Sequence, residues 1–291
     1  MAKKNVTPGV MKRRGGSKPK MVTLLIALAA VLGVNEFLWS RCEFVWRTLL
    51  TLTHWPGEVV VLIGKGGLTV FVILAAVLAI RLLHGGSMRG AVRRLGFLTL
   101  DRRQLLAGGI IAGVLVALAL AQWMILRCSA TWGQLVLVQM ATVGFAFVLH
   151  EEVVYRGFVF GELRRRTSFA TAAVISSVLF ALWHWEPALE AYRNGHHEVA
   201  VIQLSAPFLA GFALAWLFER GGGSLWGPIV AHFGQAVGQV FKVHFATSTP
   251  LWIGGNVWKV MPFIEIGVMT LIVLRFYPSA SRAGSRRRSR G

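Results

Sequence analysis

The chain has 291 residues, of which 55% are hydrophobic and 15% charged, and its formal net charge is +19. Soluble domains carry roughly 25% charged residues, so this chain has too few to cover a water-facing surface. Its Lys and Arg lie between long uncharged runs, which argues against a nucleic-acid-binding protein. Cys42 and Cys128 are the only cysteines and Asp101 the only aspartate, which excludes a disulfide scaffold, a cysteine-rich metal site and an aspartate dyad.

Eight apolar runs are long enough to cross a membrane, because a helical span needs roughly 20 mainly apolar residues. In chain order they cover residues 21–39, 58–83, 105–126, 132–163, 168–191, 200–218, 224–245 and 258–277. No small-residue cleavage site follows the first run, so we interpret it as a retained anchor and not as a signal peptide. The sequence therefore predicts an all-α fold, a polytopic membrane helix bundle with about eight transmembrane helices.

The distribution of Lys and Arg predicts the orientation of this bundle. Counted over the tails and the joints between runs, twenty-one Lys and Arg fall on one side and four on the other. Positive residues concentrate in cytoplasmic loops, so both termini are expected in the cytoplasm. We divide the chain into a basic tail at 1–20, a transmembrane bundle at 21–277 with its motif-bearing core at 132–245, and a second basic tail at 278–291. The tails can contact anionic lipid of the bilayer.

The fourth run contains the stretch HEEVVYRGFVFGEL, which places two adjacent carboxylates, Glu151 and Glu152, deep in a predicted helix over 135–163. Adjacent buried carboxylates repel each other, and desolvation disfavours both charges. Arg156 lies one turn beyond Glu152 and can pair with it. This pairing leaves Glu151 free to titrate and to act as a general base. The alternative is a structural Glu–Arg clamp that braces the helix.

The fifth run offers a histidine and an aromatic ring. Phe180 and His184 stand at i and i+4 in FALWHW and share one helix face, which Ser176 extends. Histidines inside a membrane protein are also used as hydrogen-bonded packing residues, and this alternative stays open for His184.

The seventh run carries His232, Gln235 and Gln239 in GPIVAHFGQAVGQV, and Gln239 shares the face of His232 two turns later. An interhelical hydrogen bond is again the structural alternative for the histidine. Glu151, His184 and His232 are expected to converge near the middle of the membrane. A glutamate, two histidines and an amide in one dry cavity suit water activation and oxyanion stabilisation.

Other hydrolytic and metal chemistries do not fit the spacing. HExxH would need a histidine where Val154 stands, and Ser224 in GGGSLWG does not form the serine-hydrolase pattern GxSxG. His196, His197 and Glu198 resemble a metal cluster, but adjacent histidines point apart on a helix, and these lie in an exterior joint. The sequence therefore predicts no metal and no cofactor.

The stretches EEVVYRG and FALWH and the later His232 resemble three motifs of the CAAX prenyl protease and bacteriocin-processing (CPBP, ABI) superfamily, EExxxR, FxxxH and HxxxN. They span residues 150–240, about a third of the chain, and their order on successive spans matches. By this resemblance, Glu151 and His184 would activate the hydrolytic water without metal, and His232 would help to hold the oxyanion. Glu152 and Arg156 would brace the site.

One position departs from the family pattern. The asparagine of HxxxN falls at residue 236, where this chain has Ala236. Loss of one oxyanion donor typically costs about 10²–10³ in rate. Gln235 or Gln239 would then have to supply the missing amide.

The sequence therefore predicts a metal-independent, glutamate-dependent intramembrane endopeptidase, a multi-pass protein of a prokaryotic plasma membrane. Its partners would be membrane-associated proteins or peptides: prenylated tails, leader peptides or sortase-like C-terminal signals. The alternatives are a catalytically weak relative serving as regulator, immunity factor or scaffold, which Ala236 favours, and a transporter, for which the sequence lacks repeats and broken helices. Cys42 and Cys128 both fall on the exterior side and are candidates for a disulfide.

Overall fold

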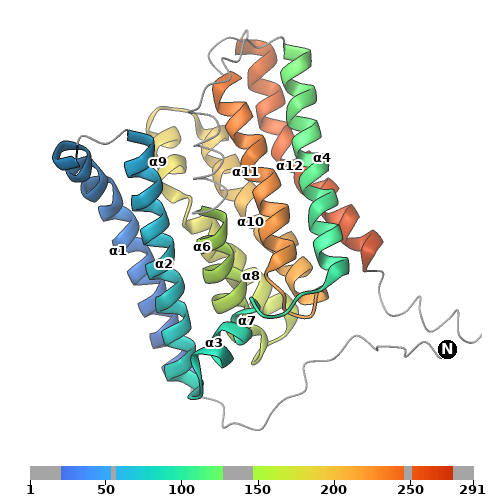
Figure 1. Cartoon of the computed structure of the whole chain (residues 1–291). Coiled ribbons are helices and arrows are strands. Elements are labelled where there is room, and N and C mark those ends of the chain that lie inside the picture. The colour runs from blue at the N-terminus through green and yellow to red at the C-terminus, as the bar shows by residue number, and fades with distance from the viewer. Residues whose placement is uncertain (1–20, 54–56, 127–146, 246–250, 278–291) are drawn as a thin grey trace, which may run out of the picture.

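The computed structural model describes residues 21–53, 57–126, 147–245 and 251–277, and over these residues the chain is helical, without strands (Figure 1). The helices are α1 (Met21–Thr53), α2 (Gly57–His84), α3 (Met88–Leu95), α4 (Arg102–Leu126), α6 (Leu149–Glu151), the π-helix η2 (Glu152–Phe160), α7 (Gly161–Arg164), α8 (Phe169–Leu182), α9 (Trp185–Arg193), α10 (His197–Arg220), α11 (Trp226–Phe245) and α12 (Leu251–Phe276). α1 and α2 pair on one side of the bundle, α4, α11 and α12 stand together on the other, and α6, η2, α7 and α8 lie between them. The predicted all-helical fold is confirmed for the described residues.

Four of the described helices are long and apolar enough to cross a membrane. The spans are Met21–Leu38 in α1, Ile63–His84 in α2, Arg102–Ala121 in α4 and His197–Arg220, which is α10. α8 and α9 meet at an angle of 52° and together can form one further span. Four or five spans are thus supported among the described residues, and the first part of the fourth predicted run, 132–146, lies outside them. Cys128 and the side chain of Cys42 also lie outside them, so the predicted disulfide does too.

The helix α1 does not end with its apolar run. The predicted span stops at residue 39, but α1 continues to Thr53. Residues 34–55 contain neither glycine nor proline, and Pro56 follows them. Glycine and proline are the residues that most disfavour a helix interior, so their absence allows the helix to continue past its apolar run.

The predicted fifth span, 168–191, is broken at its middle. α8 ends at Leu182 and α9 begins at Trp185, so His184 lies in the turn between them. Pro187 explains the break, because it has no N–H to donate to the Trp183 carbonyl and its ring would clash there. In the first turn of α9 the same proline is tolerated. A broken helix, which the sequence pattern did not reveal, therefore lies at one of the motif histidines.

Small residues hold α11 against α4. A methyl group on Gly108 would lie 2.6 Å from the Gly227 carbonyl oxygen, and one on Gly234 would collide with Ala112. Residues this small let helix backbones approach closely, which is how membrane helices associate when lipid removes the hydrophobic driving force. The contact fixes α11, and with it His232, relative to α4.

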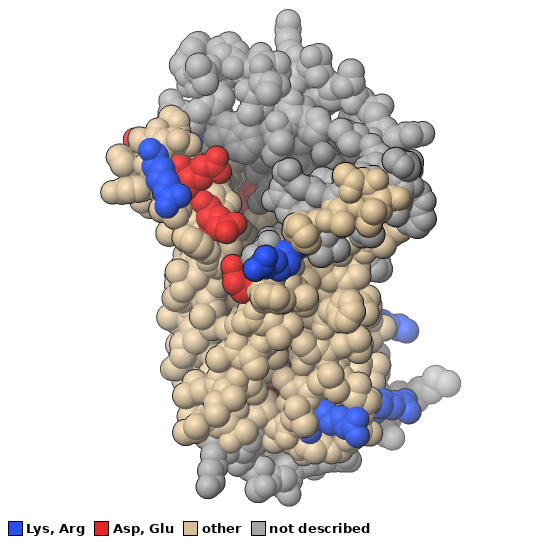
Figure 2. Space-filling view, turned by 90° about the vertical axis from the view of Figure 1, so that its left-hand side faces the viewer, with Lys and Arg blue, Asp and Glu red and all other residues tan. Residues whose placement is uncertain are grey.

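The surface fits an environment of lipid. Figure 2 shows a face on which charged side chains form one group in the upper half, reaching about mid-height, and another near the lower end, with uncharged surface between them. Large hydrophobic side chains are exposed in several helices, for example Leu25 in α1, Phe71 in α2 and Leu271 in α12, each more than half exposed. A soluble protein rarely exposes apolar surface on this scale.

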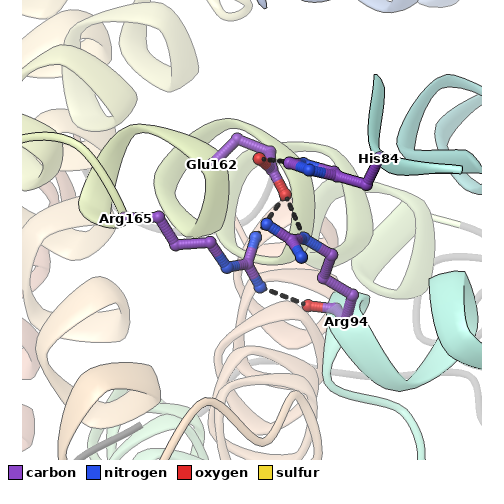
Figure 3. A network of polar contacts seen from close by, with 4 residues as sticks. All are labelled: His84, Arg94, Glu162 and Arg165. Carbon is purple, nitrogen blue, oxygen red and sulfur yellow. Dashed lines mark hydrogen bonds and ion pairs between the residues drawn. The ribbon is translucent and has the colours of Figure 1, made fainter. Parts of the chain in front are cut away.

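A buried carboxylate fastens three elements at one end of the motif-bearing segment (Figure 3). Glu162 in α7 is fully buried and accepts hydrogen bonds from His84 Nε2 at 2.8 Å and from Arg94 Nε at 3.0 Å. Arg165 also pairs with Glu162, and its Nη2 donates to the Arg94 carbonyl at 2.9 Å. Burial lowers the pKa of Arg165 to about 10 while Glu162 opposes the shift, so the guanidinium stays charged at neutral pH. From the sequence, these arginines were informative only about topology, and their convergence on Glu162 was not predicted.

Candidate active site

The carboxylate motif lies in a π-helix. Residues 152–160, predicted as part of one α-helix, form η2 instead, and every residue of η2 is buried. A π-helix closes hydrogen bonds from i to i+5, which widens the turn, and such turns are frequent at functional sites. At its end the Gly161 N–H donates to the Arg156 carbonyl, five residues back. Ser176 Oγ in α8 donates to the Tyr155 carbonyl at 2.7 Å, which ties the widened segment to α8.

Glu152 and Arg156 form the ion pair that their spacing predicts. Arg156 Nη1 lies 3.0 Å from Glu152 Oε1, and both side chains are at most 1% exposed. Glu151, the last residue of α6, is also buried. The two neighbouring carboxylates therefore have different surroundings, because Glu152 is the one that Arg156 contacts at ion-pair distance.

His232 connects α11 to both carboxylates. Its Nδ1 lies 2.7 Å from Glu152 Oε1, and its Nε2 lies 3.6 Å from Glu151 Oε2. Because a carboxylate only accepts, Nδ1 donates its hydrogen to Glu152, and the ring is oriented with its second nitrogen toward Glu151. The sequence-based hypothesis assigned His232 to the oxyanion and did not foresee this direct contact with the carboxylate pair.

Phe180 is the aromatic centre of the cluster. Its ring lies beside the rings of His184 and His232, with centroid distances of 4.9 and 5.9 Å. The guanidinium carbon of Arg156 lies 4.2 Å from the Phe180 ring centroid, a favourable cation–π contact. This side chain therefore contacts all three basic groups of the predicted site.

His184 is oriented by the backbone of α8. Its Nδ1 lies 2.9 Å from the Phe180 carbonyl oxygen. Because a carbonyl only accepts, Nδ1 carries the hydrogen and, in the neutral ring, Nε2 keeps the lone pair. His184 is thus a proton acceptor at Nε2, held in a turn next to the ring that also contacts His232.

The predicted amides are placed less closely. Gln235 lies on α11 and is buried, and the side chain of Gln239 lies outside the described residues. Ala236, one turn beyond His232, is buried and brings a methyl group where the family motif has an amide. Neither glutamine is therefore established as a donor at the site.

Several buried atoms of the cluster lack a hydrogen-bond partner among the described residues. They are Nε, Nη1 and Nη2 of Arg156 and Oε2 of Glu152. Nη1 of Arg156 is close enough to Glu152 for an ion pair but not aligned for a hydrogen bond. Unsatisfied polar groups in a buried site are candidates for contacts with a substrate or water.

The described contacts gather most of the predicted side chains into one cluster, in which the carboxylates, Arg156 and Phe180 are buried and the two histidines partly buried. Its members are Glu151, Glu152, Arg156, Phe180, His184 and His232. A buried carboxylate beside imidazoles can accept a proton from water and return it to a leaving group. In the described part of the chain, no group of three or more His, Cys, Asp and Glu side chains is arranged to hold a metal ion.

The comparison with known families points to the same segment. Residues 132–237 match the family model described as type II CAAX prenyl endopeptidase Rce1-like. The match includes η2, His184 and His232, and it confirms the resemblance of the three motifs to the CAAX prenyl protease family. That family is one of proteases, and together with the apolar helices it indicates an integral membrane hydrolase. No curated protein and no solved structure matches the chain.

Proposed function

We propose that this relative of the CAAX prenyl proteases, matched to their family over residues 132–237, is a glutamate-dependent intramembrane endopeptidase that works without a metal ion. Its substrates would be membrane-associated or C-terminally processed peptides and proteins. The observation that carries the proposal is the position of His232, with one ring nitrogen 2.7 Å from Glu152 and the other 3.6 Å from Glu151. Carboxylates and imidazole in one buried cluster are the parts that water activation requires.

Glu151 is the carboxylate that takes the proton of the attacking water. Glu152 is committed to Arg156 at 3.0 Å and to His232 at 2.7 Å, so its Oε1 is already occupied. Among the described residues, the ion-pair contact of Glu151 is the longer one to His232. A water bound to Glu151 and to His184 Nε2 would lose one proton to the carboxylate as its oxygen bonds to the scissile carbonyl carbon.

The same carboxylate completes the reaction. The tetrahedral intermediate carries a negative oxygen, which needs hydrogen-bond donors around it. When Glu151 returns its proton to the scissile nitrogen, the C–N bond breaks. The products are a new carboxyl terminus and a new amine, and the enzyme is unchanged.

The topology proposed for this activity has eight spans with both termini in the cytoplasm. It is supported by the strong bias of Lys and Arg to one side of the apolar runs. The membrane-spanning bundle at 21–277 would then hold the site within the bilayer, and the basic tails would face anionic lipid. Reporter fusions at each terminus test it, and a terminus found outside would contradict it.

Replacing Glu151 by glutamine tests the function. The amide keeps the volume of the side chain but cannot accept a proton, so cleavage should fall about 10²–10⁴-fold while the protein stays folded. Membrane-protein C-termini are compared by mass spectrometry between cells with the wild type and cells with Glu151→Gln. Glu190→Gln, an exposed glutamate of α9, is the matched control and should behave as wild type. Identical C-termini in the wild type and Glu151→Gln would contradict the proposal, as would loss of cleavage on addition of a chelator.

A further inference from the structure

The hydrogen-bond donors of the two histidines and of Ser176 at the candidate active site already have acceptors. His184 Nδ1 donates to the Phe180 carbonyl at 2.9 Å. His232 Nδ1 lies 2.7 Å from Glu152 Oε1, and Ser176 Oγ is used on the backbone of η2. The donors that remain for a developing oxyanion must therefore come from elsewhere in the cluster.

The hydrogen-bond donors of the site that have no acceptor belong to Arg156. Its guanidinium has five N–H groups, and Nε, Nη1 and Nη2 all lack a hydrogen-bond partner among the described residues, although the side chain is at most 1% exposed. Buried donors are almost always satisfied in folded proteins. Nη1 already lies 3.0 Å from Glu152 Oε1, so Nε and Nη2 are the nitrogens with donors to spare, and they indicate a position that a further acceptor fills.

The guanidinium lies next to the groups proposed to carry out the reaction. Arg156 Nη1 and His232 Nδ1 approach the same oxygen of Glu152, at 3.0 and 2.7 Å, so the two nitrogens are less than about 6 Å apart. Phe180 covers the guanidinium at 4.2 Å and also contacts His184. A carbonyl oxygen held between these residues would be within reach of Arg156.

We propose that Arg156 donates to the oxyanion of the tetrahedral intermediate, in addition to pairing with Glu152. This inference rests on the proposed protease function. It also accounts for Ala236, whose methyl group follows His232 by one turn and has no donor to offer. A charged donor that is already buried needs no reorganisation as the negative charge forms, which is the condition for strong electrostatic stabilisation.

The central test is a rescue experiment. Lysine at position 156 keeps a cation near Glu152 but loses the guanidinium fork, so Arg156→Lys should lower the cleavage rate about 10²–10³-fold. Adding Ala236→Asn to this variant places an amide donor one turn beyond His232. The cleavage rate of the double variant should be at least tenfold higher than that of Arg156→Lys alone. An amide at 236 cannot replace a charge partner of Glu152, so a purely structural role of Arg156 would show no rescue.

The rates are measured with purified protein in lipid nanodiscs, mixed with membranes from cells lacking the protein. The readout is the appearance of the C-termini that the wild type generates and Glu151→Gln does not. Arg165→Lys, in the Glu162 network, is the matched control and should keep the wild-type rate. If Glu151→Gln generates the same C-termini as the wild type, the proposed function itself fails, which is a separate outcome.

Three results would overturn the role of Arg156 while leaving the protease intact. The first is a wild-type cleavage rate for Arg156→Lys. The second is a rate of Arg156→Lys that does not rise when Ala236→Asn is added. The third is a hundredfold loss of cleavage rate in Gln235→Leu, which would assign the oxyanion donor to Gln235. If Arg156→Lys does not fold, Ala236→Asn alone decides. If Arg156 already supplies the oxyanion donor, the cleavage rate of Ala236→Asn should differ from the wild-type rate by less than about threefold. A rise of about a hundredfold would show that the wild type lacks this donor.

Discussion

Two buried carboxylate sites lie along the same segment of the chain, and they are satisfied to different degrees. At Glu162, His84 bonds one carboxylate oxygen, and Arg94 and Arg165 bond the other. At the motif, Glu151 and Glu152 share one arginine and one histidine. Three basic groups serve one carboxylate at the first site, whereas two basic groups serve two carboxylates at the second.

This difference separates a structural site from a reactive one. The carboxylate of Glu162 has a partner on each oxygen, as the interior of a stable protein requires. At the motif, Oε2 of Glu152 and three nitrogens of Arg156 have no hydrogen-bond partner among the described residues. Missing hydrogen-bond partners lower the stability of the free protein, and they are retained at functional sites where a substrate or water supplies the missing partner. We therefore expect substitutions at the motif to affect the rate of cleavage and substitutions at Glu162 to affect folding.

The largest expected effect tests the reactive half of the comparison. His184→Ala removes the imidazole whose Nε2 is proposed to bind the attacking water, so cleavage should fall about 10²–10⁴-fold, as in Glu151→Gln. The unfolding temperature should change little, because the hydrogen bond of His184 goes to the Phe180 carbonyl in the preceding turn. His197→Ala, at the exposed start of α10, is the control. A His184→Ala variant with the wild-type rate would mean that this histidine only packs.

A smaller effect, on stability, tests the structural half. Glu162→Gln leaves Arg94 and Arg165 facing an uncharged amide and should lower the free energy of unfolding by about 3 kcal/mol. This is the low end for a broken buried pair, because the arginine side chains are 33% and 19% exposed and can turn toward headgroups. The measurement is thermal unfolding in detergent, together with the cleavage rate per folded molecule, which should stay within about threefold of wild type.

The surface pair of Glu219 with Arg164 is the matched control for this experiment. Its atoms lie 2.8 Å apart, but the side chains are 32% and 38% exposed. Glu219→Gln should therefore cost less than about 1 kcal/mol. Equal losses of stability in the two variants would contradict the structural assignment of Glu162.

The sequence predicted most where one local property decides the structure. Apolar runs located α2 and α4 to within a few residues, and the spacing of Glu152 and Arg156 predicted their ion pair. Hydropathy measures the cost of transfer into lipid and not the continuity of backbone hydrogen bonds. It therefore missed the extension of α1 to Thr53 and the break before Pro187.

Contacts between elements that are far apart in the chain could not be predicted from the sequence. The pairing of His232 with Glu152 joins residues 80 positions apart, and the bond of Arg94 with Glu162 joins residues 68 apart. In a single sequence, nothing distinguishes an arginine that orients the chain in the membrane from one that reaches a buried carboxylate. The winding of η2 as a π-helix was equally unreadable, because side chains at i and i+4 stay close in both kinds of helix.

The smallest expected effect concerns the link between η2 and α8. Ser176→Ala removes the hydrogen bond to the Tyr155 carbonyl and should lower the free energy of unfolding by about 1 kcal/mol, the usual net value of one such bond. Ser177 is the matched control, since its hydroxyl is equally buried but has no hydrogen-bond partner among the described residues. Ser177→Ala should be neutral or slightly stabilising, because it removes an unsatisfied polar atom. Thermal unfolding of both variants is compared with wild type. If Ser176→Ala is as stable as Ser177→Ala, the hydrogen bond does not hold the π-helix to α8, and the packing of Phe180 against Tyr155, with ring centroids 5.2 Å apart, is left as the contact that positions the carboxylates.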